Sequence, residues 1–192
     1  YIDPTNYSRR ANTMFYISDV HSTAPAVYTT QLQKGVYQIL EQLGIHFERV
    51  DTDEAITMED CIFINKTLGM KMVKTIFLCN RKQSDFYLFI TCGDKPFSSK
   101  GFSKALGVAR VSFTPPETME KMLGTKVGAA TVFSAAVDTD QSVRIIFDRE
   151  VVERQWYGCS DGTTTGYLKV STDDIINRFL PFTKHELTII EV

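Results

Sequence analysis

No stretch of the 192-residue chain approaches the roughly 20 consecutive apolar residues that a membrane-spanning helix needs. The opening segment, YIDPTNYSRRANTMFYISDV, also lacks the apolar core of a secretory signal peptide. We therefore expect a cytoplasmic protein. The composition, 43% hydrophobic and 23% charged, is typical of one soluble domain large enough to bury a core.

We expect that domain to cover residues 26–192, with residues 1–25 forming an N-terminal tail. Met14 is an alternative start, which would make the first thirteen residues upstream or artificial sequence. We expect those thirteen residues to be disordered.

The chain also lacks the common catalytic signatures. It has no G-x-S-x-G elbow, no H-E-x-x-H pair, no Walker loop and no G-x-G-x-x-G after a strand. The four cysteines are far apart without a C-x-x-C, so we expect reduced thiols, no zinc site and no disulfide framework; they are Cys61, Cys79, Cys92 and Cys159. Cys159 lies in the segment WYGCSDGTTTG, which we predict to be a loop, and with no histidine nearby it is a poor nucleophile.

Histidine is scarce as well. We expect His21, in the tail, His46, in a strand, and His185, in a helix-to-strand connection, to be structural or solvated. We accordingly expect no metal and no cofactor.

Charge is unevenly distributed, although the net charge is only −2. Residues 61–110 hold nine lysines and arginines but only two acidic residues, a local balance of +7. This asymmetry suggests a surface that meets an anion such as a phosphate chain. A solvated basic hairpin is the alternative.

Hydrophobic periodicity and turn signals predict a mixture of helices and strands. Thr57 and Asp60 resemble a capping box, and the strands 72–81 and 86–91 read as an antiparallel hairpin. We expect an α+β fold with a largely antiparallel or mixed sheet. The predicted helices cover 31–43, 57–69, a short segment ending at Gly107, 116–124 and 173–180, and the further strands cover 45–51, 109–113, 143–148 and 186–192.

Lys74 is a charged residue in a predicted strand that is otherwise mostly apolar, MVKTIFLCNR. Counting by twos puts it on the same face as Ile76 and Leu78, and an unpaired buried ammonium is costly. Either the lysine belongs to a site, or its stem packs while its head reaches solvent at the end of the strand.

Five motifs occur in an order that resembles the YbaK/prolyl-tRNA-synthetase-associated domain family, and within it the free-standing PrdX-type deacylases. The resemblance spans residues 30–192 and implies a partly barrelled sheet flanked by helices. It also implies a trans-editing enzyme that hydrolyses the ester of mischarged tRNA(Pro), with alanine the expected amino acid. The motifs are VKTIFLCNR (73–81), FYLFITCGDKPF (86–97), KALGVARVSF (104–113), PETMEKMLG (116–124) and VGAATVF (127–133).

The resemblance also implies roles for individual residues. Lys74 matches a lysine that faces the editing pocket, and Gly128 and Ala129 match a loop whose backbone N–H groups meet the ester carbonyl. Alone, this small-residue loop is weak evidence, because such loops often merely turn the chain. The implied partners are the 3′ end of aminoacyl-tRNA(Pro) and, transiently, prolyl-tRNA synthetase. The positions expected to bind substrate are Thr75, Arg110, Ser112, Ala130, Thr131, Ser160 and Thr164.

Several positions depart from the commoner family pattern. Thr75 and Cys79 replace an asparagine and a second lysine, Val132 replaces a proline, and Ser160 and Thr164 stand where histidine and asparagine are common. Two interpretations follow: a deacylase, with selectivity shifted by these changes, or a noncatalytic relative that binds an amino acid or aminoacyl-tRNA as a sensor.

Overall fold

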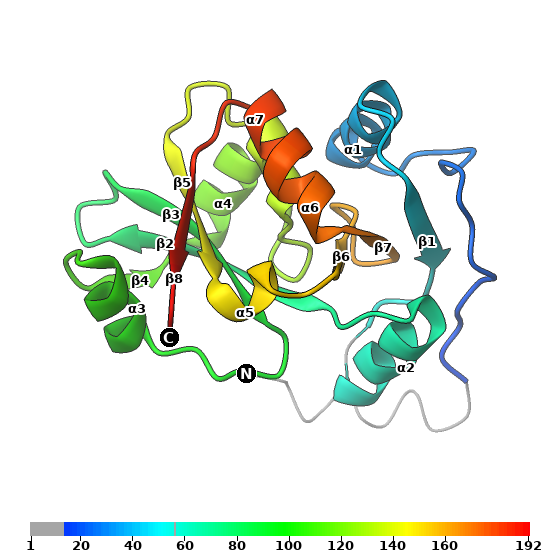
Figure 1. The fold of residues 1–192 in the computed structure, drawn as a ribbon, viewed down its shortest axis with the longest axis horizontal. Helices are drawn as coiled ribbons and strands as arrows, with labels where there is room; N and C mark the ends of the chain where they lie inside the picture. The colour runs from blue at the N-terminus through cyan, green and yellow to red at the C-terminus, as the bar shows by residue number, and fades with distance from the viewer. Residues whose placement is uncertain (1–13, 56) are drawn as a thin grey trace.

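The computed structural model describes residues 14–192 apart from residue 56, and its strands form two sheets (Figure 1). The predicted disorder of residues 1–13 lies outside the described residues. The larger sheet has the order β4 (Val111–Phe113), β2 (Val73–Asn80), β3 (Phe86–Cys92), β5 (Val143–Asp148) and β8 (Leu187–Ile190). The smaller sheet has the order β1 (Phe47–Asp51), β7 (Gly166–Ser171) and β6 (Trp156–Ser160).

The two sheets together contain both antiparallel and parallel strand pairs. The pairs β2–β3, β2–β4, β1–β7 and β6–β7 are antiparallel, whereas β3–β5 and β5–β8 are parallel. The predicted α+β fold with a mixed, largely antiparallel sheet flanked by helices is confirmed, and the described strands form two sheets without closing into a barrel.

The helices begin and end where local signals indicated. The capping box of Thr57 and Asp60 opens α2 (Met58–Leu68), and Gly69 closes it with φ of +61°. The other helical segments are α1 (Gln31–Gln42), α3 (Ser99–Leu106), α4 (Pro116–Leu123), η2 (Val132–Ala136), α5 (Arg149–Val152), α6 (Thr172–Asp174), η3 (Ile175–Phe179) and α7 (Leu180–Phe182). The last three follow one another without a break in Figure 1.

The segment 156–166 is not the loop we predicted. Residues 156–160 form β6, which pairs with β7, and only 161–165 connect the two strands. The glycines and hydroxyl residues of this segment suggested a loop, but four of the five β6 residues are buried. Burial against the core outweighed the turn-forming composition.

The two sheets meet where β2 begins. Met72 pairs with Gly158 of β6 in an isolated parallel bridge. A Cβ atom on Gly158 would collide with the Met70 side chain, so glycine allows Met70 to pack directly on the backbone at this crossing. β6 therefore lies between β7 and the start of β2.

The N-terminal segment runs along β1. Ile17 and His21 form isolated antiparallel bridges with Thr52 and Arg49, and the Arg49 guanidinium donates a hydrogen bond from Nε to the Thr23 oxygen at 2.6 Å. These contacts tie residues 17–23 to the folded body. The domain boundary at residue 26 stays a prediction.

Candidate active site

Two segments far apart in the sequence meet at the end of β6. The Thr125 hydroxyl donates to the Gly162 oxygen at 3.2 Å, and the Ser160 hydroxyl lies 3.5 Å from the Ala129 oxygen. Thr131 Oγ1 lies 3.7 Å from the buried Cys159 thiol. The small-residue loop 125–131 is therefore held against β6 and the β6–β7 loop.

Some backbone N–H groups of this loop donate hydrogen bonds within the protein, and others do not. Ala129 N–H donates to the Lys126 oxygen at 3.1 Å, which removes it from the donors that we expected to face a substrate. Within the described part of the chain, no hydrogen bond uses the N–H of Gly128 or Ala130. Gly128 has φ of +94° and is exposed. This positive φ favours glycine and turns the chain so that unpaired donors remain in the loop.

Asp161 holds the β6–β7 loop in place, and the sequence analysis missed it. Its buried carboxylate accepts hydrogen bonds from Gln33 Nε2 and Tyr37 Oη, both at 2.9 Å, and from Thr163 Oγ1 at 2.7 Å. Burial and the nearby Asp161 carboxylate raise the pKa of Tyr37, so the phenol stays a donor. The Asp161-Gly162 pair is a common turn signal that could have drawn attention to this position.

The hydroxyl groups of Ser160 and Thr164, beside and within the β6–β7 loop, form hydrogen bonds with other protein groups. Ser160 Oγ accepts from Gly162 N–H at 3.0 Å and donates to the Thr163 oxygen at 2.6 Å. Thr164 donates to Glu54 Oε1 at 2.9 Å, and its Cγ2 is 3.9 Å from the position a Cβ on Gly128 would take. The structure thus brings Ser160 and Thr164 to Gly128–Thr131, with Ser160 shaping the loop from inside.

Lys74 occupies a cleft of about 440 Å³ between α2 and the beginning of β2. The side chain is half-buried, and its ammonium donates to the Lys95 oxygen at 2.6 Å. The ammonium therefore has a backbone partner, and the choice between the two readings of this lysine stays a prediction. The bond to Lys95 uses one of three N–H donors.

Thr75 points to the other face of β2, toward Tyr157. The Tyr157 hydroxyl is fully buried, and Thr75 is the side chain that interacts with it. Burial raises its pKa and that of the Cys159 thiol, the latter to about 12. Cys159 therefore remains protonated at neutral pH and is a poor nucleophile, as expected.

Arg110 and Ser112 lie away from this cluster. Ser112 on β4 pairs with Cys79, five residues along β2 from Lys74 and thus about 17 Å distant at the usual rise per residue. Arg110 is exposed and lines a separate hollow of about 400 Å³ with Ser99, Lys100 and Ser103. The structure does not bring these two residues to the loop cluster, and their predicted roles in binding substrate stay predictions.

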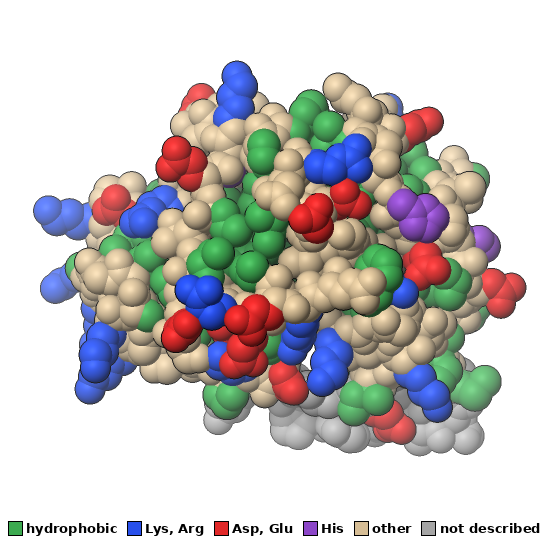
Figure 2. Space-filling view, in the orientation of Figure 1, with side chains coloured by type: hydrophobic (Ala, Val, Ile, Leu, Met, Phe, Trp, Pro, Cys, Tyr) green, Lys and Arg blue, Asp and Glu red, His purple; other side chains and the backbone are tan. Residues whose placement is uncertain are grey.

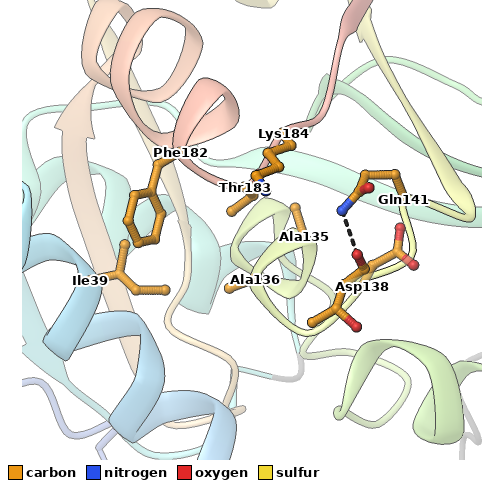
Figure 3. A pocket seen from close by; sticks show the side chains of 9 residues that line it. Ile39, Ala135, Ala136, Asp138, Gln141, Phe182, Thr183 and Lys184 are labelled. Atoms are coloured by element: carbon orange, nitrogen blue, oxygen red, sulfur yellow. Dashed lines mark hydrogen bonds between the residues drawn. The ribbon is translucent and has the colours of Figure 1, made fainter.

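Another hollow, of about 240 Å³, lies between α1, η2 and α7 (Figure 3). Ile39 and Phe182 face each other across one side of it, and Asp138 lines the other. The Asp138 carboxylate is already occupied by Ser142, Val143 N–H and His185. His185 is thus structural, as expected.

Residues 14–55 and 57–192 show no sign of a metal site or of a membrane-spanning helix. In that part of the chain, no cluster of three or more His, Cys, Asp or Glu residues has the geometry to hold a metal ion. None of its helices combines the length and apolar character needed to cross a membrane. The four cysteines are free, as predicted.

Comparison with known proteins agrees with the geometry. Two curated relatives are similar over most of their length: the prolyl-tRNA editing protein ProX of Acetoanaerobium sticklandii, 23% identical over 74% of this chain and 87% of that protein, and the prolyl-tRNA synthetase associated domain-containing protein 1 of Danio rerio, 24% identical over 86% and 90%. A solved structure assigned as a trans-editing enzyme for prolyl tRNA synthetase shares the fold, with a TM-score of 0.61, 15% identity, and coverage of 86% of this chain and 99% of that one. The profile of the aminoacyl-tRNA editing domain matches residues 52–177, so the chain belongs to that family and is an aminoacyl-tRNA deacylase.

Proposed function

We propose that this protein hydrolyses the ester bond of mischarged tRNA(Pro) in trans, and that alanine is the amino acid it removes. The tRNA assignment is supported by the relatives named for prolyl-tRNA editing. The choice of alanine is supported by the resemblance of the sequence motifs to PrdX-type deacylases. The observation that carries the proposal is the pair of unpaired amide N–H groups at Gly128 and Ala130.

These donors fit the chemistry of ester hydrolysis. A water oxygen adds to the carbonyl carbon, and the carbonyl oxygen takes on negative charge. The bond to the ribose oxygen then breaks, and that oxygen takes up a proton. In this proposal, Gly128 and Ala130 N–H donate to the developing oxyanion; losing one such donor commonly costs about 10²- to 10³-fold in rate. An aminoacyl ester is already activated, so orientation and this stabilisation supply much of the rate without a triad.

Lys74 and the pocket walls supply orientation in this proposal. The two free N–H donors of the Lys74 ammonium bind a phosphate or ribose oxygen of the terminal adenosine. Thr75, Ala130 and Thr131 are proposed to surround the amino acid. A small pocket admits alanine and excludes the larger proline ring, and one altered contact shifts such discrimination by roughly 1 to 3 kcal/mol.

Incubation with tRNA(Pro) carrying alanine, serine or proline tests the proposal. We expect release of alanine, slower release of serine, and no release of proline above the uncatalysed rate. The matched control is alanine on its own cognate tRNA, which should be a poorer substrate if the tRNA is read. A protein that binds these tRNAs but leaves every ester intact would be the sensor, and the deacylase proposal would fail.

The transient partnership with prolyl-tRNA synthetase also stays a prediction. Acting in trans requires the substrate to leave the synthetase first, so a weak or absent complex is compatible with activity. Sedimentation of the two proteins together, with and without tRNA(Pro), would measure the association.

A further inference from the structure

Apart from Lys74, the proposed function leaves a basic groove beside α2 unexplained. It consists of the Lys74 cleft and an adjoining hollow of about 650 Å³, which share Ile62, Asn65, Lys71 and Arg154. Lys66 lines the outer part, so four basic side chains face the groove, whereas Asp94 is the one acidic residue among the residues that line it. This charge favours an anionic occupant.

Arg154 is the strongest sign that the groove is built for such an occupant. Its Nη1 atom is buried and has no hydrogen-bond partner among the described residues. A buried donor on a charged group is costly to leave unpaired. Arg154 also lines both hollows, and because its guanidinium fork matches phosphate geometry, the N–H donors that face the groove suit a phosphate.

Trp156 gives the outer end of the groove an aromatic surface. Its side chain is 38% exposed and lines the outer hollow. The Lys169 ammonium sits 4.5 Å from the ring centroid and forms an ion pair with Glu48 at 3.1 Å. The ammonium thus covers one face of the ring, while Trp156 still lines the hollow.

β6 connects this groove to the small-residue loop. Along the strand, Trp156 lies in the groove, Gly158 pairs with Met72, and Ser160 reaches the Ala129 oxygen. Four residues of strand separate the two ends by about 13 Å. This distance is short enough for one single-stranded segment to contact both the groove and the loop.

We propose that the α2 groove binds the single-stranded 3′ end of the tRNA upstream of the esterified adenosine. Lys71 and Arg154 contact its phosphates, and Trp156 stacks on a base. Basic side chains that follow the backbone, combined with an aromatic platform, are the usual means of binding single strands. The inference rests on the proposed function, because it assigns the groove to the same substrate.

Binding can be measured without any ester hydrolysis. Trp156 is the only tryptophan in the chain, so its fluorescence reports on this groove directly. We expect an RNA hairpin with a single-stranded CCA end to change the emission at saturation, and a blunt hairpin of the same stem to change it far less. Equal affinity for both hairpins, or unchanged emission at saturating CCA hairpin, would overturn the proposal.

Variants separate the groove from the site of hydrolysis. Trp156→Ala and Arg154→Gln should raise KM for alanyl-tRNA(Pro) roughly five- to hundredfold, the range typical of losing one stacked base, and leave kcat within about twofold. Trp156→Phe should restore most of the affinity, which controls for misfolding. Lys34→Gln, an exposed change on α1, is the matched control.

Alanyl-adenosine distinguishes a defect in the groove from a defect in the hydrolytic site, because it keeps the ester but lacks the upstream nucleotides. On this substrate the groove variants should act like the unaltered protein. Equal losses on both substrates would place Trp156 and Arg154 in the hydrolytic site and overturn the groove. If the unaltered protein hydrolyses neither substrate yet binds the CCA hairpin, the proposed function fails while the groove stands.

Discussion

Gly128 shows how one residue can determine a chemical environment. Its φ of +94° is strained for any residue with a side chain, whereas space is not limiting, because an added Cβ would lie 3.9 Å from Thr164 Cγ2. The glycine is therefore required by backbone conformation.

We expect Gly128→Ala to lower kcat/KM for alanyl-tRNA at least tenfold, because the backbone must relax and the N–H groups lose their direction. The free energy of unfolding should fall by only about 1 kcal/mol, the usual cost of a left-handed conformation. Chemical denaturation and single-turnover deacylation would measure the two effects. Gly101→Ala, on α3, is the control, since its φ is not positive. Full activity in Gly128→Ala would argue against an oxyanion role.

Lys74 illustrates a different constraint, the need of a half-buried ammonium for oxygen partners. The Lys95 oxygen provides one, and the cleft leaves the remaining donors able to meet substrate.

Lys74→Met, which keeps most of the apolar stem, should lower kcat/KM at least tenfold, or about 1.4 kcal/mol of transition-state stabilisation. Stability should change little, because the stem still packs. Lys34→Met, an exposed change on α1, should leave kcat/KM within twofold. Steady-state kinetics and thermal unfolding of both variants would check this. Unaltered kinetics in Lys74→Met would remove the lysine from the site.

At the scale of elements, buried carboxylates join segments that are distant in sequence. Asp161 connects the β6–β7 loop to α1 through Gln33 and Tyr37. Asp138 connects the end of η2 to β5 through Val143 N–H and to the start of β8 through His185, whose Nε2 lies 2.9 Å away. Each buried carboxylate accepts hydrogen bonds from several protein donors in place of water, as a buried polar group requires.

Asp138 should make stability depend on acid. Burial raises the pKa of its carboxyl, but hydrogen bonds from His185, Ser142 and Val143 outweigh burial and hold the pKa below the ordinary 3.8. A lowered pKa gives stability that is complete above about pH 4 and is lost as pH falls through the folded value. Between pH 5 and 2 the free energy of unfolding should therefore fall more steeply in the unaltered protein than in Asp138→Asn. Parallel curves from urea titrations would contradict this assignment.

On the whole molecule, basic side chains gather at the end that carries α3 and the β2–β3 turn (Figure 2). Arg81, Lys82, Lys100, Lys104 and Arg110 are all exposed there. This end is distant from β6 and β7 in Figure 1, so it suits contact with the body of a tRNA rather than with the ester.

Affinity for tRNA should consequently fall as salt rises, because phosphate contacts release counterions. KM for alanyl-tRNA should increase severalfold between 50 and about 200 mM salt, whereas hydrolysis of alanyl-adenosine should change little. Replacing Lys100 and Lys104 together with glutamine should flatten the salt dependence. A salt-independent KM for the tRNA would mean that this basic end serves another purpose.

The sequence by itself determined the local structure. The capping box of Thr57 and Asp60, the glycine that ends α2, and the β2–β3 hairpin all depend on residues close together in the chain, so their signals are readable without the fold. Ordered motifs also identified the family and drew attention to Lys74 and Gly128.

Only the tertiary structure decided which residues meet. The pairing of β6 with β7, the approach of Ser160 to Ala129, and the Asp161 contacts join positions up to 128 residues apart. It also separated Arg110 from Lys74 and placed Arg154 and Trp156 beside Lys66 and Lys71 in one groove. Such contacts depend on how the two sheets pack against each other, and packing is a property of the complete core, so no local pattern in the sequence records it.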